Sequence, residues 1–330
     1  MNITLIGGSG FIGTSLSRRL AQRADLSFDI VDKVPSRAFP GHCVLADVRS
    51  MPALRASVKA GSILVNLAAE HRDDVQPRRL YDEVNVQGAR NICTVARECA
   101  VPRIVFTSSV AVYGFAPPGT DESGRIAPFN DYGRTKFEAE QVFRDWQAEA
   151  PAQRSLVIVR PTVVFGERNR GNVYNLLRQI ASGWFVMIGG GDNRKSMAYV
   201  ENVAAFLEHC LSFGPGVHVY NFIDKPDYTM NSLVAAVRRQ LGQDGNRMLR
   251  LPLSVGYLIG KGFDVLAAIS GRTFPISTIR VRKFVASTAF DSRARTTGFE
   301  SPYSLPDALA RTVSHEFMHG PQEGELFFSE

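Results

Sequence analysis

The sequence has few cysteines, and no pattern organises them. Cys43, Cys93, Cys99 and Cys210 are the only four in 330 residues, and their spacing fits no metal-ligand motif. We therefore expect no bound metal. Buried, reduced thiols of the kind found in cytoplasmic proteins are the interpretation that we favour.

Long hydrophobic runs are also missing. The longest candidate, 251–269, is interrupted by Lys261 and Asp264, and no run reaches the roughly 20 apolar residues that span a bilayer. This segment is typical of an amphipathic or buried helix, and contact with a membrane surface stays open as an alternative. The opening residues MNITLIGGSG lack the features of an export signal. These absences predict a cytoplasmic protein without a transmembrane segment.

The chain carries a surplus of positive charge. Its formal net charge is +6, and the basic residues that gather late in the sequence are Arg280, Arg282, Lys283, Arg293 and Arg295. Such a surplus attracts nucleic acid, membrane phosphates or an anionic small molecule. No nucleic-acid motif accompanies it, so we expect a diphosphate-bearing small molecule and no nucleic acid.

Strand and helix patterns alternate through the first half of the chain. Apolar strand-like runs occupy 3–6, 28–31, 43–46, 63–68, 104–106 and 156–159, and helical patterns fill 11–23, 80–99 and 132–149. Alternation of this kind predicts an α/β fold of the Rossmann type, a doubly wound parallel sheet covered on both faces. Ligands of such sheets bind beyond the carboxyl ends of the strands.

The pattern loosens after Pro161, which indicates a second, smaller lobe. Loops at 166–172 and 189–193 precede helical patterns at 173–182 and 199–211, and 217–222 is strand-like. The remainder is typical of helices, with turns at Pro226, Pro252, Gly271 and Pro302. We expect a cofactor domain at 1–165, to which segments near 195–225 return, and a mainly substrate-binding lobe at 166–330.

A glycine turn joins the first strand to the first helix. Gly7, Gly10 and Gly13 leave room for backbone N–H groups to approach a pyrophosphate at the positive end of the helix. The second strand ends in Asp32, where an acid binds the adenosine ribose hydroxyls. Asp32 would repel a 2′-phosphate, which favours NAD over NADP, and the neighbouring Lys33 weakens that preference.

Further contacts with this cofactor are expected after the third and fourth strands. Asp47 and Val48 are placed to meet the adenine. Leu67, Ala68 and Ala69 end the fourth strand, and the two alanines are small enough for the dinucleotide to pass closely.

A tyrosine and a lysine share one face of the helix predicted at 132–149. Tyr132 and Lys136 stand at i and i+4, so the lysine charge lowers the pKa of the phenol from its ordinary value of about 10. Tyr132 is then a usable acid or base near neutral pH. Ser109, after the fifth strand, is expected to hydrogen-bond the same substrate oxygen.

As a set, these residues resemble the extended short-chain dehydrogenase/reductase family, also called the NAD-dependent epimerase/dehydratase family. The resemblance covers nearly the whole chain, and it is carried by Gly7-x-x-Gly10-x-x-Gly13, Asp32, Asp47, 66-NLAA-69, Asn85-Val86-x-Gly88, Ser109, Tyr132-x-x-x-Lys136 and Arg160-Pro161. It implies a Rossmann lobe, a C-terminal lobe for a nucleotide-diphosphate sugar, and a catalytic triad of Ser109, Tyr132 and Lys136. Lys136 would also hold the nicotinamide ribose.

The resemblance implies further contacts and an assembly. The remaining residues of the predicted cofactor site are Phe11, Ile12, Asn85, Thr107 and Pro161, although an amide on the helix surface is an equal alternative for Asn85. A homodimer through a four-helix contact of 80–99 and 132–149 follows by analogy with the family.

The reaction is narrowed by the two residues after Ser109. Dehydratases of this family carry an Asp-Glu pair there, whereas Val110 and Ala111 cannot exchange a proton. Two reactions remain. One is a 4-epimerase that passes through a transient 4-keto sugar on tightly held NAD, and the other is an NAD(P)H-dependent 4-keto sugar reductase. Asp32 favours the epimerase.

The predicted substrate site draws on several parts of the chain. Beside Ser109, the candidates are His71, Asn172, Arg194, Lys195 and Arg280, the last with Arg282 as a cationic clamp. The alternatives are a solvated basic face for the cations and an ordinary loop histidine for His71.

Two hypotheses come from other classes. The chain could be a non-catalytic NAD(P)-binding regulator, which the intact triad argues against. A steroid or flavonoid reductase of the same fold would be expected to have an apolar pocket rather than these cations.

Overall fold

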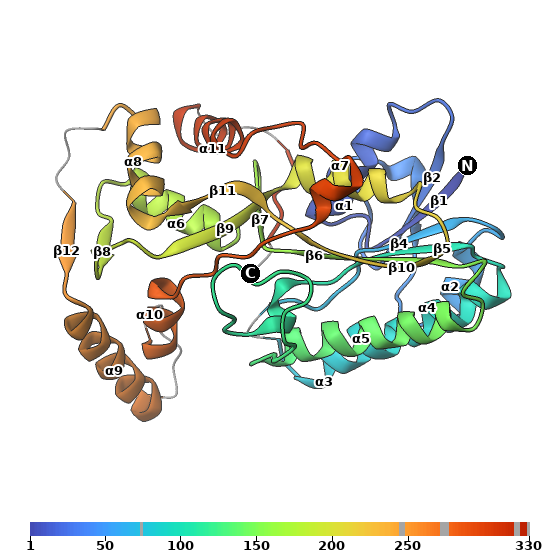
Figure 1. Cartoon of the computed structure of the whole chain (residues 1–330), viewed down its shortest axis with the longest axis horizontal. Coiled ribbons are helices and arrows are strands. Elements are labelled where there is room, and N and C mark those ends of the chain that lie inside the picture. Colours follow the sequence, from blue (N-terminus) through green and yellow to red (C-terminus); the bar gives the residue numbers. More distant parts are fainter. Residues whose placement is uncertain (73–74, 244–247, 271–276, 320–323, 329–330) are drawn as a thin grey trace.

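A seven-stranded parallel sheet forms the centre of the computed structural model, which describes residues 1–72, 75–243, 248–270, 277–319 and 324–328. Its order is β10-β6-β5-β4-β1-β2-β3, which confirms the predicted Rossmann-type fold (Figure 1). The strands are β1 (Asn2–Ile6), β2 (Ser27–Asp32), β3 (Cys43–Leu45), β4 (Ile63–Asn66), β5 (Arg103–Thr107), β6 (Ser155–Pro161) and β10 (Gly216–Phe222).

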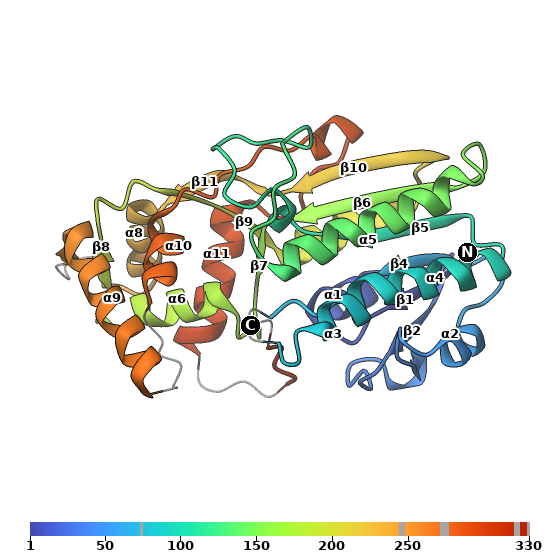
Figure 2. The same cartoon turned by 90° about the horizontal axis from the view of Figure 1, so that it is seen from below.

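Helices cover both faces of this sheet (Figure 2). One face carries α1 (Phe11–Leu20) and α7 (Val200–Cys210), and the other carries α2 (Met51–Ser57), α4 (Gly88–Glu98) and α5 (Asp131–Ala148). Side chains alternate along each strand, so Ile3 and Leu5 enter one core and Ile6 enters the other. Because both faces are covered, β4 and β6 are buried at every residue.

The helix predicted at 80–99 is built from three consecutive pieces. It begins as α3 (Arg79–Tyr81), continues as the π-helical segment Asp82–Gln87, and ends as α4. The extra residue in the π-helical turn changes the direction of the side chains that follow. This irregularity carries Asn85, one of the predicted site residues.

The second lobe contains strands that the sequence pattern does not reveal. The strands β7 (Val163–Phe165), β9 (Arg194–Tyr199) and β11 (Asp224–Thr229) form one sheet, and β8 (Val186–Ile188) pairs with β12 (Leu249–Leu251). The remainder after β10 is mostly helical, as predicted, but the strands β11 and β12 within it were not predicted. The helices of this lobe are α6 (Asn172–Ala181), α8 (Met230–Gln240), α9 (Leu253–Ser270), α10 (Thr278–Val285) and α11 (Leu305–Val313).

Pro226 shows why one of these strands was missed. We expected a turn there, yet Pro226 lies within β11, an edge strand whose pairing with β9 shifts register between Asp224 and Tyr228. A proline is tolerated on an edge strand because its missing N–H is not needed by a neighbour. Of the other expected turns, Gly271 lies outside the described residues.

The chain passes between the two lobes repeatedly. It leaves the large sheet after β6, returns through α7 and β10, and leaves again into β11. The division into a cofactor domain and a substrate lobe remains a prediction about function. All four cysteines are free thiols, and among the described residues none of the helices has the length and apolarity to cross a membrane.

Candidate active site

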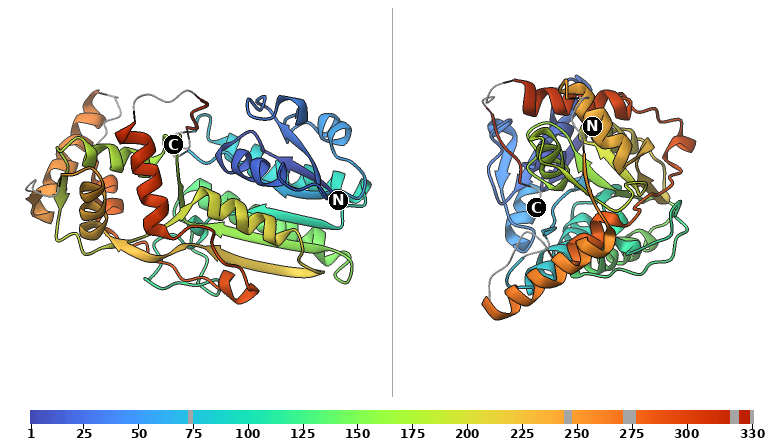
Figure 3. Two further views of the ribbon diagram at one scale, coloured as in Figure 1. Left: turned by 90° about the horizontal axis from the view of Figure 1, so that it is seen from above. Right: turned by 90° about the vertical axis from the view of Figure 1, so that its left-hand side faces the viewer.

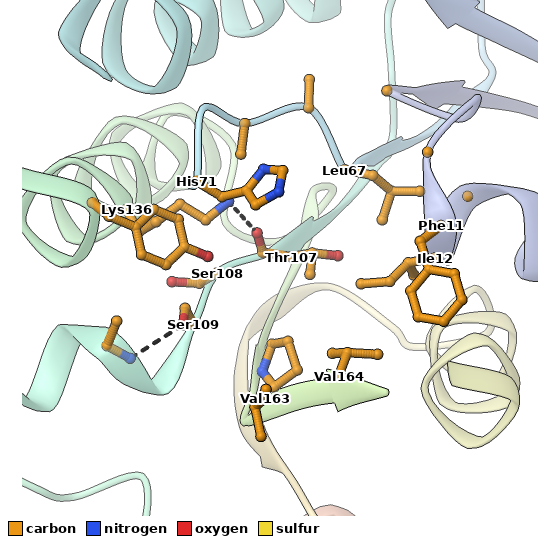
Figure 4. Close-up of a pocket in the computed structure, with 18 of the residues that line it drawn as sticks. Phe11, Ile12, Leu67, His71, Thr107, Ser108, Ser109, Lys136, Val163 and Val164 are labelled. Carbon is orange, nitrogen blue, oxygen red and sulfur yellow. Dashed lines mark hydrogen bonds between the residues drawn. The ribbon is translucent and has the colours of Figure 1, made fainter. Parts of the chain in front are cut away.

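A cavity of about 860 Å³ opens beyond the carboxyl ends of β1, β2, β4, β5 and β6. Figure 4 shows His71, Ser109 and Lys136 on one side of it, Phe11, Ile12 and Leu67 on the other, and Val163 and Val164 on a third. Both lobes line the cavity, as expected for a ligand site in an open parallel sheet.

The glycine turn is held in place by close backbone contacts. Gly7 has a positive φ of 78°, and a Cβ there would lie 2.5 Å from the Ala68 nitrogen. A Cβ on Gly13 would lie 2.5 Å from the Gly8 carbonyl oxygen. Gly7 and Gly13 are therefore required by the protein itself, because the side chains of other residues would separate packed backbone.

Gly10 is different, because the space beside it belongs to the cavity. A Cβ there would meet only the Gly7 carbonyl oxygen, at 3.6 Å. Gly10 is also the N-cap residue of α1 and supplies no side-chain cap to its first N–H groups. The turn thus leaves room for an anion directly before a helix N-terminus.

Asp32 lies beside the glycine turn, at the end of β2. Its carboxylate accepts hydrogen bonds from the Ser9 N–H at 3.0 Å and the Val34 N–H at 3.1 Å, and it lines the cavity. The ammonium of Lys33 pairs with the Glu70 carboxylate at 2.9 Å. A carboxylate here repels a phosphate on the adenosine ribose, and the pairing of Lys33 reduces its ability to offset that repulsion.

The residues predicted to meet the adenine and the rest of the dinucleotide also line the cavity. Asp47 accepts hydrogen bonds from the Arg49 guanidinium, with 2.7 Å between Oδ2 and Nη2, and this contact holds the pKa of its carboxyl below the ordinary range. Two nearby groups complete this part of the wall: Val48 beside Asp47, and Leu67, Ala68 and Ala69 beside the glycine turn.

Asn85 lies outside the cavity. Its Oδ1 accepts from the Glu70 N–H at 2.9 Å, and its Nδ2 donates to the Glu70 carbonyl and to Thr135 Oγ1, both at 3.0 Å. The side chain therefore ties the loop after β4 to α5. The structure does not bring Asn85 to the wall where we expected it to meet the cofactor.

The three predicted catalytic residues converge on the cavity. The N-cap Asn130 accepts a hydrogen bond from the Gly133 N–H at 2.9 Å, which fixes the start of α5 beside Tyr132. Tyr132 and Lys136 follow on one helix face, and both line the cavity. Ser109 lines it from the segment after β5, where its Oγ accepts from the Ala111 N–H at 3.1 Å.

Lys136 is buried, with 2% of its surface exposed. Its Nζ donates to the Thr107 carbonyl at 2.6 Å and lies 4.6 Å from the centre of the Phe106 ring. Burial lowers its pKa to about 7, although the Glu140 carboxylate acts in the opposite direction. The ammonium is thus held in a site where its field is poorly screened by water.

A buried polar network lies behind these residues, between α5 and β6, and the sequence patterns did not predict it. Arg160 donates two hydrogen bonds to the Glu140 carboxylate, at 2.8 and 2.5 Å, and a third to the Tyr113 hydroxyl at 2.7 Å. Ser108 Oγ donates to Glu140 at 2.6 Å. This network fixes α5 against β6, because breaking a buried ion pair typically costs about 3–5 kcal/mol.

Two features of the cavity wall fit a bound dinucleotide. The open space at Gly10 would be filled by any side chain, and Thr107 Oγ1 is buried at the wall with no hydrogen-bond partner in the described structure. An unsatisfied buried hydroxyl is unfavourable, so a polar ligand group there would restore its hydrogen bond. Phe11, Ile12 and Pro161, which we expect to contact the cofactor, also line the cavity.

The predicted substrate residues divide into two groups. His71, Ser109 and Asn172 line the cavity, whereas Arg194, Lys195 and Arg280 do not. Lys195 Nζ donates to the Lys283 and Ala286 carbonyls at 3.0 and 2.6 Å, so it caps the end of α10. Burial lowers its pKa to about 8. We therefore correct the expectation that these three cations line the substrate site.

Other lining residues were not predicted. Lys283 is the cation that α10 contributes to the wall, next to Thr288 and Phe290. The C-terminal segment 326–328 also lines the cavity, because Phe327 exchanges backbone hydrogen bonds with Arg168 and Arg170 and its ring lies 5.6 Å from that of Phe11. No local pattern in the sequence connects this segment to the glycine turn.

Comparison with known proteins gives a consistent result. Residues 3–222 match the model of the NAD dependent epimerase/dehydratase family. A protein of Escherichia coli O157:H7, N-acetyl-alpha-D-glucosaminyl-diphospho-ditrans,octacis-undecaprenol 4-epimerase, is 47% identical over 100% of this chain and 99% of its own length. UDP-glucose 4-epimerase of Vibrio cholerae is 27% identical over 94% of both chains.

Solved structures share the fold at low sequence identity. UDP-glucose 4-epimerase of Thermotoga maritima, solved with UDP-glucose, has a TM-score of 0.75 at 18% identity over 96% of this chain and 98% of its own. UDP-glucuronic acid 4-epimerase of Bacillus cereus, solved with NAD, has a TM-score of 0.73 at 16% identity over the same shares. These likenesses establish the architecture.

The glycine turn predicts that two similar substitutions have different effects. Gly13→Ala forces packed backbone apart and is expected to lower the free energy of unfolding by about 3 kcal/mol. Gly10→Ala costs about 1 kcal/mol or less as a change of N-cap residue, but it should weaken NAD binding about tenfold or more. Chemical denaturation and NAD titration calorimetry measure the two effects. Equal losses of stability would contradict the distinction.

Burial of Lys136 predicts a pH-dependent stability. Its pKa is about 7 in the folded protein and about 10.4 in an unfolded chain, so between these values the unfolded state holds more protons. The free energy of unfolding of the wild type, minus that of Lys136→Met, should therefore rise between pH 7 and 10. Urea denaturation of the ligand-free proteins at pH 6.5 and 9.5 measures this difference. A difference independent of pH would show that burial does not shift the lysine.

Proposed function

Since the chain belongs to the NAD dependent epimerase/dehydratase family, we propose that it is an enzyme that inverts C4 of a hexose carried on a diphosphate. The observation that supports this most directly is the convergence of Ser109, Tyr132 and Lys136 on one wall of a cavity that fits a dinucleotide. The full-length identity of 47% to a 4-epimerase favours this reaction over reduction.

NAD is the cofactor of the family, and when bound it supplies an acceptor and a donor of hydride for C4. The phenol oxygen of Tyr132 takes the proton of the sugar 4-hydroxyl and later returns it to the oxygen on C4 of the sugar. Ser109 donates a hydrogen bond to that oxygen as negative charge develops. Val110 and Ala111 offer no acid for the loss of water, so the hexose keeps its hydroxyl groups.

Lys136 acts through its charge rather than by transferring a proton to the sugar. Its ammonium is held at the end of β5 by the Thr107 carbonyl, one helical turn from Tyr132. A nearby cation stabilises a phenolate, which makes Tyr132 a stronger acid than a free phenol. The Arg160–Glu140 pair fixes the helix that carries both groups, so it is a positioning element.

The group beyond the diphosphate has two candidates. The Vibrio cholerae relative is named for a nucleotide sugar, the class that the sequence predicts, and the Escherichia coli relative is named for a sugar on undecaprenol diphosphate. The higher identity and full coverage favour a polyprenol carrier. Lys283, at the wall that the second lobe contributes, is the cation that we assign to the diphosphate.

We also propose a cytoplasmic homodimer. The expected contact is made by 80–99 and 132–149, whose helices α4 and α5 lie side by side on one face of the large sheet (Figures 1 and 2). A four-helix contact would place one outer face of each helix against the partner. The glycine turn and the three catalytic candidates line one cavity of a single chain, so each subunit would hold a complete site.

Incubation without added cofactor distinguishes the reactions. The enzyme is expected to convert N-acetylglucosaminyl-diphospho-polyprenol to its C4 epimer, with UDP-N-acetylglucosamine as the competing substrate. Tyr132→Phe should lower kcat by about 10²–10⁴-fold, because it removes the proton-transferring oxygen. Chromatography and NMR identify the epimer. Inertness towards all of these sugars, together with NADH oxidation by 4-keto sugars, would identify a reductase instead.

Two cations on α10 provide a matched pair. Lys283→Ala is expected to raise KM for a water-soluble, short-chain prenyl diphosphate sugar about tenfold, because it removes a charge from the diphosphate site. Arg280→Ala should leave KM unchanged, because Arg280 does not line the cavity. Steady-state kinetics measure both, and an equal effect of the two substitutions would refute the assignment of Lys283.

A further inference from the structure

Helix α9 exposes its large apolar side chains. The residues that we call the α9 stripe are Val255, Leu258, Ile259, Val265 and Leu266. Leu258 is 71% exposed and Val265 is 58% exposed. At about 3.6 residues per turn, these five positions fall on one side of the helix, with Gly262 among them. An exposed apolar patch of this kind marks a contact surface.

On the opposite side of α9, two buried glycines pack against the protein. A Cβ on Gly256 would lie 2.6 Å from Ile188 Cγ2 of β8, and one on Gly260 would lie 3.0 Å from the Thr278 backbone at the start of α10. An ordinary surface helix turns its large apolar residues inward. Here glycines make the close contact with the protein, and leucine, isoleucine and valine face outward.

The stripe lies beside a surplus of positive charge. In the described parts of α9 and α10, the charged residues are Lys261, Arg280, Arg282 and Lys283 against the single carboxylate of Asp264. That carboxylate accepts from the Thr278 N–H at 3.2 Å and so faces the start of α10. An apolar helix face with Lys261 on the same helix and further cations on the neighbouring α10 complements an anionic lipid surface, whose headgroups attract Lys and Arg while its acyl chains take up Leu and Val.

The same pair of helices leads from the stripe to the cavity. Lys283, near the end of α10, lines the cavity, and its Nζ lies 5.4 Å from the centre of the Phe129 ring. The Arg282 guanidinium lies 4.7 Å from the Phe115 ring, which in turn lies 4.7 Å from Phe129. The eight residues of α10 span only about 12 Å. Figure 3 shows α9 projecting from the body of the molecule, where a flat surface can reach it.

We propose that the α9 stripe docks on an anionic membrane surface and so brings the cavity to a sugar diphosphate whose polyprenol chain stays in the bilayer. The identity of that substrate rests on the proposed function, whereas the docking itself rests on the surface alone. No reaction step is added, because the lipid chain anchors the sugar and takes no part in the chemistry.

Vesicle binding tests the docking directly. The full-length protein is expected to sediment with phosphatidylglycerol–phosphatidylethanolamine vesicles and to bind phosphatidylcholine vesicles more weakly. Leu258→Asp should lower the partition coefficient about tenfold or more, because it places a charge where a large aliphatic side chain enters the bilayer. Leu258→Ser, which adds no charge, should cause a smaller loss in the same direction.

Leu45→Asp is the matched control. Leu45 is 62% exposed on the edge strand β3 of the other lobe, so its substitution should leave vesicle binding unchanged. The proposal is overturned if the wild type stays in the supernatant, if Leu258→Asp binds as tightly as the wild type, or if Leu45→Asp loses binding equally. It is also overturned if sedimentation velocity shows that Leu258→Asp lowers the oligomeric mass, because the stripe would then be a contact between copies.

An activity measurement separates this proposal from the proposed function. Leu258→Asp should retain wild-type kcat/KM on a water-soluble short-chain prenyl diphosphate sugar and lose about tenfold on a long-chain polyprenyl substrate in vesicles. Equal activity on the vesicle-borne substrate would contradict the role of docking in substrate access. If neither substrate is epimerised, the proposed function fails, while vesicle binding by the wild type and its loss in Leu258→Asp still support the membrane contact.

Discussion

A lysine ammonium buried at the end of a parallel strand is the constraint on which the rest of the site depends. Lys136 exchanges the hydration of water for one carbonyl at the end of β5, the face of an aromatic ring and a distant carboxylate. Burial makes that charge costly and, for the same reason, strong at short range. The register of α5, the position of β5 and the Arg160–Glu140 pair must all be maintained to keep it beside the phenol.

Much of the first lobe was predictable because its signals are local. Continuous apolar runs mark strands buried on both faces, and the glycine spacing marks a turn where backbone approaches backbone. The i, i+4 pair of Tyr132 and Lys136 needs only one helix to bring its members together. Each of these features depends on a few neighbouring residues, so it can be predicted from a single sequence.

The second lobe was harder because its determinants are distant in the chain. The strand β11 is polar and contains a proline, and only its pairing with β9 makes it a strand. Lys195 looked like a phosphate ligand until the structure placed the end of α10 above it. The hydropathy of α9 indicated a helix, but which side faces the protein depends on glycines that meet β8 and α10.

The repeated passage of the chain between the lobes has a mechanical consequence. The backbone crosses at Thr162, between Tyr199 and Val200, and at Ile223. Ala294 and Phe299 later pack in the core of the large sheet again before α11, so several covalent connections join the two halves. Any opening or closing must bend these connections together, which restricts twisting far more than a single linker would. The large sheet also receives its outermost strand, β10, only after β7 to β9 have been made, so no single cut of the polypeptide yields two intact halves.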